Sequence, residues 1–166
     1  MRYSTLATPA GPLTVLVADE RVVGSGFTSS VEDLIARVPV RLREERVTRA
    51  RDMGAIGRAV ADYFEGHLLA IDAIGVEQSS GPFIERAWAT LRDVAPGAPV
   101  TYRELAAASG RPAAVRAAAS ACARNNVALF VPCHRVVRTG GALGGFHWGL
   151  DVKRRLLGHE ARQSII

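Results

Sequence analysis

The sequence is poor in cysteine, in lysine and in long apolar runs. It has two cysteines, Cys122 and Cys133, which are too few for a disulfide framework. Its predominantly apolar stretches, such as 13–18 and 127–131, are far shorter than the roughly 18 to 20 residues of a membrane helix. The polar start at 1–5 lacks the apolar region of a signal peptide. We therefore expect a cytoplasmic protein with no membrane partner, in which both cysteines are thiols.

Charge is unevenly distributed along the 166 residues. Residues 1–80 carry nine arginines and eleven acidic side chains, a formal charge of −2. Residues 81–166 carry eleven arginines, one lysine and five acidic side chains, a formal charge of +7. Such a basic half is typical of proteins that bind a polyanion such as nucleic acid. Arginine-rich and alanine-rich chains also arise from genomic base composition, so charge alone leaves both interpretations open.

Hydrophobic patterning predicts an α/β (α+β) fold with two parts. Apolar residues make up 48% of the chain, enough for a sizeable core. Short apolar runs separated by turn residues predict a small antiparallel sheet within 5–27 and a further strand at 72–76, and three- and four-residue spacing predicts a helix over 48–65. We expect a sheet-containing supporting domain over 1–80 and a mainly helical domain over 81–166.

The second half carries a helix-turn-helix pattern. Thr101 and Glu104 form a capping-box pair that predicts a helix start, and Gly110 predicts its end. A further helix is expected over 113–122, where nearly every side chain is small and Arg116 stands among alanines. Two helices joined by a short glycine-containing turn are typical of DNA-binding motifs. Tight packing of a buried alanine-rich helix is the alternative, although an unpaired arginine disfavours complete burial.

A reactive constellation follows the second helix. A strand-like run over 125–131 leads directly into Pro132-Cys133-His134-Arg135. A single cysteine or histidine is usually structural, but a cysteine in a proline-fixed turn beside a histidine and an arginine indicates nucleophilic chemistry.

The chain resembles the O6-alkylguanine-DNA alkyltransferases, or methylated-DNA–protein-cysteine methyltransferases, most closely the C-terminal domain of the adaptive-response members. The resemblance covers residues 83–160. Its motifs are Pro132-Cys133-His134-Arg135-Val136, Thr101-Tyr102-Arg103-Glu104-Leu105-Ala106, Arg116, Asn125 and Lys153-Arg154-Arg155-Leu156-Leu157-Gly158-His159-Glu160. It implies DNA repair by irreversible transfer of one alkyl group from O6-alkylguanine, and from O4-alkylthymine, to the protein.

The resemblance also implies site residues. Cys133 is the alkyl acceptor, His134 acts on it through a water, Glu160 orients His134, and Asn125 braces the turn before the cysteine. The implied DNA-binding residues are Thr101, Tyr102, Ala114, Arg116, Ala117 and Ala119, on a helix-turn-helix in the minor groove, with Tyr102 rotating the target phosphate and Arg116 filling the place of the flipped base. We expect no cofactor and no metal, because the histidines form no coherent ligand set. The expected partner is double-stranded DNA containing O6-alkylguanine, bound by a monomer.

The base pocket is implied to involve Tyr102, Cys122, Val136, Leu143, Phe146, His147 and Trp148. The carbonyls of Cys133 and Val136 are implied to accept hydrogen bonds from the guanine amino group, and residues 143–148 are implied to form the opposite wall. Many relatives have Tyr-Ser-Gly or Tyr-Gly-Gly where this chain has Phe146-His147-Trp148, and many have proline at Asn126. The bulk of Trp148 predicts a preference for methyl over benzyl adducts.

Three other functions compete with this interpretation. A non-catalytic alkyltransferase-like lesion-binding protein usually lacks the reactive cysteine, so Cys133 argues against it. A transcriptional regulator with a four-cysteine zinc module is disfavoured because residues 1–80 contain no cysteine. A cysteine hydrolase stays open, although no oxyanion-hole motif stands out.

Overall fold

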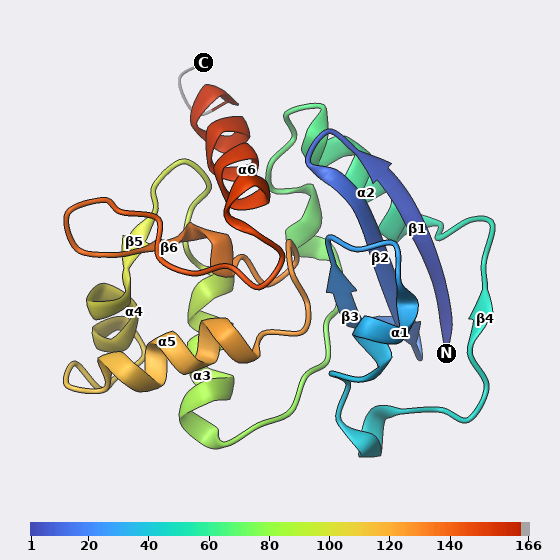
Figure 1. Cartoon of the computed structure of the whole chain (residues 1–166), viewed down its shortest axis with the longest axis horizontal. Coiled ribbons are helices and arrows are strands. Elements are labelled where there is room, and N and C mark those ends of the chain that lie inside the picture. The colour runs from blue at the N-terminus through green and yellow to red at the C-terminus, as the bar shows by residue number, and fades with distance from the viewer. Residues whose placement is uncertain (164–166) are drawn as a thin grey trace. The chain divides into compact units, whose positions relative to one another are not determined.

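The computed structural model describes residues 1–163, and its chain divides into two compact units (Figure 1). The first unit comprises 1–78 and 126–130, and the second comprises 79–125 and the chain from 131 onward. The segment 126–130 therefore belongs to a different unit from the residues on either side of it. These units are defined by contacts within the chain. Whether two domains meet after residue 80 stays a prediction. No helix within the described residues is long and apolar enough to cross a bilayer.

The first unit is built on a four-stranded sheet with the order β3-β2-β1-β4 (Figure 1). Strands β1 (Arg2–Thr8), β2 (Gly11–Ala18) and β3 (Arg21–Gly26) form an antiparallel meander, and β4 (Thr48–Arg49) adds a short parallel edge. Positive φ at Asp19 and Glu20 makes the tight second turn. The predicted antiparallel sheet is confirmed.

Two helices accompany this sheet, α1 (Val31–Ile35) and α2 (Ala55–Phe64), with 3-10 turns at Val40–Leu42 and Ala70–Ala73. In central strand β2, residues 13–17 are all buried, so both faces of this strand are covered. Leu16 packs with Val31 and Val38 on the α1 side. The core of this unit is therefore centred on β2.

Two local predictions in this unit are wrong. The helix predicted over 48–65 begins only at Ala55, because residues 48–49 pair with β1 and Gly54 takes a left-handed φ of 56°. The strand predicted over 72–76 is not formed: residues 72 and 73 end a 3-10 turn, and Val76 forms one isolated bridge with Val22. At 48–54 the pairing with β1 and the conformation of Gly54 outweigh the helical spacing of apolar residues. Pairing with a distant strand cannot be predicted from local periodicity.

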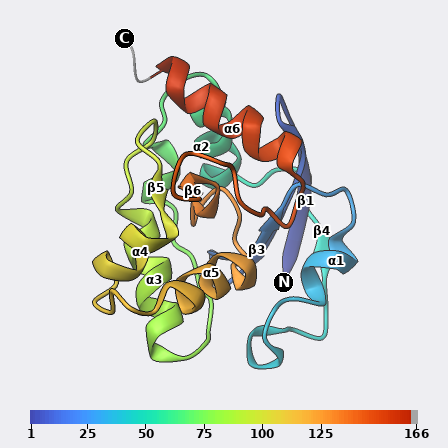
Figure 2. The ribbon, with the colours of Figure 1, turned by 60° about the vertical axis from the view of Figure 1, so that its left-hand side comes forward.

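The second unit is mainly helical, as predicted (Figure 2). It contains α3 (Pro82–Arg92), α4 (Tyr102–Ala108), α5 (Val115–Arg124) and α6 (Leu150–Gln163), with a two-stranded parallel sheet of β5 (Val100–Thr101) and β6 (Val136–Val137). Helix α5 packs on both α3 and α4, and Ala118 and Ala121 are fully buried there. Trp88 of α3 donates its indole N–H to the Ala121 carbonyl at 2.8 Å.

The strand expected over 125–131 is not a strand. Residue Val127 forms one isolated bridge with Ser25, after which the chain turns through Leu129 at a left-handed φ of 74°. Ser25 N–H donates to the Asn126 carbonyl at 2.8 Å, and Ala128 N–H donates to the Ser25 carbonyl at 2.9 Å. The apolar pattern reflects burial in the first unit, and the positive φ ends the pairing after one bridge.

Candidate active site

The helix-turn-helix expected from the sequence is present in α4 and α5. Thr101 Oγ1 accepts from Glu104 N–H at 3.1 Å, and Glu104 accepts from Thr101 N–H at 2.6 Å, so both halves of the capping box form. Gly110 has a φ of 89° after α4, the left-handed conformation expected at a helix end. Helix α5 begins at Val115, slightly later than the predicted start.

One face of α5 is buried and another is open. Ala118 and Ala121 face the core, whereas Ala114, Ala117 and Ala119 are half-buried and Arg116 is exposed. Complete burial of an alanine-rich helix, the alternative considered above, is therefore excluded. A surface of small side chains with one exposed arginine can approach a partner closely.

Cys133 lies in a short 3-10 helix, Cys133–Arg135, that follows Pro132 and is buried. A cavity of about 210 Å³ reaches it, lined by Tyr102, Ala119, Cys122, Ala123, Asn125, Cys133, Gly145, Phe146, His147 and Trp148. The cavity thus brings together residues from α4, α5, the cysteine turn and the loop before α6. Its lining is mostly apolar, which suits a flat organic ring.

Five of the seven residues predicted for the base pocket line this cavity, namely Tyr102, Cys122, Phe146, His147 and Trp148. Val136 and Leu143 are not in its lining. Val136 is fully buried, and its carbonyl already accepts a hydrogen bond from Lys153. Gly145 lies within the predicted wall 143–148, whereas Ala123 lines the cavity without having been predicted, because it contributes a small surface rather than a chemical group.

Tyr102 is held against the loop before α6. Gly144 has a φ of 70°, and a Cβ added there would lie 2.7 Å from the Tyr102 hydroxyl oxygen. Only glycine leaves room for this ring. Burial raises the pKa of the Tyr102 phenol, and Cys122 raises it further, so the hydroxyl is a neutral donor at the cavity wall.

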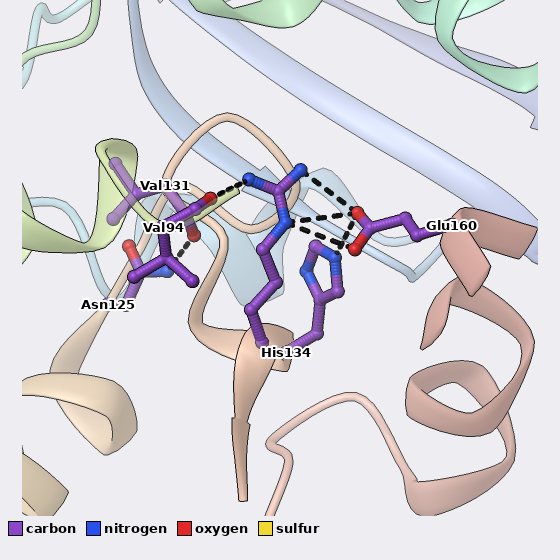
Figure 3. A network of polar contacts seen from close by, with 6 residues as sticks. Val94, Asn125, Val131, His134 and Glu160 are labelled. Atoms are coloured by element: carbon purple, nitrogen blue, oxygen red, sulfur yellow. Dashed lines mark hydrogen bonds and ion pairs between the residues drawn. The ribbon is translucent and has the colours of Figure 1, made fainter. Parts of the chain in front are cut away.

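His134 and Glu160 form a fully buried pair, although they are 26 residues apart (Figure 3). Nε2 of His134 lies 2.7 Å from Oε1 of Glu160. Burial alone would raise the pKa of Glu160, but His134 and Arg135 lower it to about 2, so the carboxylate is ionised. Burial lowers the pKa of His134, which favours the neutral ring. The pair predicted from the resemblance is therefore in direct contact.

This contact determines the tautomer of His134. An ionised carboxylate only accepts hydrogen bonds, so Nε2 must carry the proton. The lone pair of the neutral ring is then on Nδ1, which is buried and has no hydrogen-bond partner within residues 1–163. Nδ1 is consequently the atom of His134 that can accept a proton.

Lys153 is a fully buried cation beside the cavity. Its Nζ donates to the carbonyls of Val136 at 2.6 Å and Gly145 at 3.1 Å. Burial lowers its pKa, whereas the nearby thiols Cys133 and Cys122 act in the opposite direction. Carbonyls do not neutralise the ammonium as a carboxylate would. Its positive charge can therefore stabilise a nearby thiolate.

Asn125 closes the short excursion of the chain through 126–130. Its side-chain Nδ2 donates to the Val131 carbonyl at 2.8 Å, across the two points where the chain leaves and re-enters the second unit (Figure 3). Asn125 is 3% exposed and also contributes to the cavity lining. Asn125 therefore holds Val131 in place, two residues before Cys133.

Comparison with known proteins agrees with this geometry. The chain is 36% identical to the methylated-DNA–protein-cysteine methyltransferase of Salmonella typhimurium over 162 residues, which span 93% of this chain and 92% of that protein. It is 31% identical over 166 residues to the protein of the same name from Metallosphaera sedula, covering 100% of this chain and 96% of that one. The chain belongs to the methylated-DNA–protein-cysteine methyltransferase family.

A family model and a solved structure also match this member of the methyltransferase family. Residues 82–162 match the 6-O-methylguanine DNA methyltransferase, DNA binding domain. The crystal structure of Mycobacterium tuberculosis OGT in complex with DNA superposes with a TM-score of 0.82 at 26% identity, covering 98% of this chain and 94% of that chain. The predicted family and the α/β fold class are therefore confirmed.

Two residues of the candidate site, Lys153 and Arg135, form more contacts than their sequence positions predict. Both were named above only as members of the family motifs, without a role of their own. In the structure both are buried, and both form hydrogen bonds to other residues of the site. A signal exists for Lys153, because it shares one helical face with Leu156 and Glu160 at spacings of three and four. For Arg135 no local signal exists, since its partners are distant in sequence.

Proposed function

We propose that this protein repairs DNA by transferring the alkyl group of O6-alkylguanine, and of O4-alkylthymine, irreversibly to Cys133. The observation that carries the proposal is the cavity in which Cys133 faces an apolar, ring-sized space next to the His134–Glu160 pair. The substrate class follows from the names of the relatives, and the nucleophile follows from the chemistry of this cavity. Transfer to a protein thiol requires no cofactor.

The reaction is a displacement at carbon. The Cys133 thiol passes its proton to Nδ1 of His134 through one water, while Nε2 of His134 keeps its hydrogen bond to Glu160. The sulfur–carbon bond forms as the carbon–O6 bond breaks, and its electron pair returns to the guanine, which takes up one proton. The product is a thioether, which water does not readily cleave. Each protein molecule therefore reacts once.

Access to the lesion requires base flipping, because O6 is out of reach in a stacked and paired base. The open face of α5 supports minor-groove binding, with Arg116 filling the vacated place in the stack and Tyr102 rotating the target phosphate. Thr101, Ala114, Ala117 and Ala119 complete the proposed contact surface. We propose further that the protein acts in the cytoplasm as a monomer on double-stranded DNA.

The deciding experiment uses duplex DNA with O6-methylguanine labelled in the methyl group, followed by peptide mapping. We expect one equivalent of label per chain, all of it on the peptide containing Cys133. Cys133→Ala should take up none, whereas Cys122→Ala, the matched removal of the other thiol in the cavity, should retain uptake. Burial and the nearby Cys133 raise the pKa of Cys122, so it stays a poorly nucleophilic thiol.

The same experiment separates the competing functions. A lesion-binding protein without activity would retain the duplex but carry no label. A hydrolase would release labelled product with repeated turnover, and turnover beyond one equivalent would reject the proposal. Label on Cys122 alone would reject the choice of nucleophile.

A further inference from the structure

The guanidinium of Arg135 is placed on the same carboxylate as the imidazole of His134. Arg135 is 1% exposed. Its Nη2 donates to Oε1 of Glu160 at 3.0 Å, and its Nε lies 3.2 Å from Oε1 and 3.1 Å from Oε2. Both oxygens of Glu160 are therefore held, which fixes the plane of the carboxylate toward His134.

A second contact fixes the guanidinium itself. Nη1 of Arg135 donates to the Val94 carbonyl at 2.7 Å, just beyond the C-terminal end of α3. Carbonyls at a helix end carry partial negative charge and suit a cation. Arg135 thereby links the end of α3 to Glu160 on α6, and it cannot rotate away from the carboxylate without breaking this bond.

The charges in this buried cluster then constrain His134. Glu160 contributes one negative charge and Arg135 one positive charge, so the pair is already balanced. Within residues 1–163 no other carboxylate is buried, so a proton on His134 would add a positive charge that nothing compensates, and this is costly away from water. Lys153 adds to the same repulsion.

We propose that Arg135 is a positioning residue of the reaction: by occupying the Glu160 carboxylate beside His134, it keeps the imidazole neutral, with its proton on Nε2 and its lone pair on Nδ1. The inference rests on the proposed function, in which Nδ1 receives the proton of Cys133. Without Arg135, Glu160 would instead form an ion pair with a protonated His134, and the ring would lose its capacity as a base.

The electrostatics agree with this assignment. The charged groups acting on His134 within the described residues are Glu160 and Lys153 from α6 and Arg135 from the cysteine turn. Burial lowers the pKa of His134, Glu160 raises it, and Arg135 and Lys153 lower it further. Removing Arg135 should therefore raise the pKa of His134, whereas removing the charge of Glu160 should lower it.

The first test observes His134 directly in the unmodified protein by ¹⁵N-detected NMR of the imidazole between pH 5 and 8. We expect a neutral ring at pH 7 with the proton on Nε2. A protonated ring at pH 7, or a proton on Nδ1, would overturn the inference. Because this readout needs no DNA, it is independent of whether the protein transfers alkyl groups.

The second test compares three variants in single-turnover methyl transfer from duplex DNA across the same pH range. We expect Arg135→Gln to move the acid limb of the rate profile about one pH unit higher, and Glu160→Gln to move it lower. Arg135→Lys keeps the charge and should leave the acid limb near its original position with a reduced rate. A purely structural role would lower all rates without opposite shifts, and that result would contradict the proposal.

If Arg135→Gln does not fold, Arg135→Met replaces it, and the pKa of His134 is measured by NMR in Arg135→Met and Arg135→Lys. A pKa of His134 that is raised in Arg135→Met and unchanged in Arg135→Lys supports the inference, and equal pKa values in the wild type and both variants overturn it. Labelling of Cys133 in the unmodified protein is measured in parallel. Absence of label there refutes the proposed function, while an incorrect His134 protonation state with normal label refutes only the role of Arg135.

Discussion

Lys153 donates a hydrogen bond from its ammonium group to the Val136 carbonyl at 2.6 Å, and this contact joins α6 to the chain that follows Cys133. The same ammonium reaches the Gly145 carbonyl in the loop lining the cavity. It therefore ties the chain after Cys133 to the loop that lines the cavity, and places a positive charge near both thiols.

Replacing Lys153 by methionine should slow methyl transfer at least about tenfold, because the charge that favours the developing thiolate is lost together with the two hydrogen bonds. The rate is measured by single-turnover transfer from duplex DNA. Arg154→Met removes an exposed positive charge from the next position of α6 and serves as the control. Equal losses in both variants would show that only the overall charge matters.

Arg116→Ala should reduce repair of duplex DNA by about tenfold or more while changing the reaction with free O6-benzylguanine less than twofold, because filling the base stack matters only in a duplex. Arg124→Ala, which removes the exposed arginine at the end of the same helix, is the matched control. Parallel losses with both substrates would reject the assignment of Arg116 to the base stack.

Trp148 should restrict the adducts that the cavity accepts. In the structure its ring meets that of His147 edge-to-face at 4.5 Å between centroids, and both line the cavity. We expect methyl adducts to react faster than benzyl adducts, and Trp148→Gly to increase the benzyl rate about tenfold relative to the methyl rate. His147→Gly keeps the indole and should alter this ratio much less.

Glu160 should make the protein sensitive to acid. Its pKa is lowered to about 2 in the folded state, below that of an unfolded glutamate, so its stabilising effect is complete above about pH 5 and is lost as the pH falls toward 2. The lost stability is about 3 kcal/mol. Urea unfolding of the wild type and of Glu160→Gln between pH 3 and 7 measures this, and the variant should show a flatter dependence. An equally steep dependence would assign the acid sensitivity to other groups.

Asn126 should stabilise the first unit. Its Oδ1 accepts from Nε of Arg37 at 3.0 Å, its side-chain amide donates to the Arg37 carbonyl, and its backbone N–H donates to Oε1 of Gln78 at 2.8 Å. Proline at this position could form none of these three bonds. Asn126→Ala should lower the free energy of unfolding by about 1–3 kcal/mol. In a double-mutant cycle with Arg37→Ala, additive losses would refute a direct coupling.

Local rules predicted the parts of this protein whose causes are local. The capping box at Thr101 and Glu104 forms because both partners lie within one helical turn. The meander of β1 to β3 follows from alternating apolar runs and turn residues. The same rules failed at 48–54 and at 127–131, where pairing with distant strands and left-handed residues control the backbone.

The sequence by itself determined the nucleophile candidate, the helix-turn-helix and the family resemblance, because each depends on residue identity at short and fixed spacing. Only the tertiary structure decided which groups meet. It placed Arg135 and His134 on one carboxylate of α6, buried Lys153 against two carbonyls, and left Val136 and Leu143 outside the cavity lining. Protonation states in a buried site depend on these long-range contacts and on exclusion of water, and neither is contained in the spacing of residues along the chain.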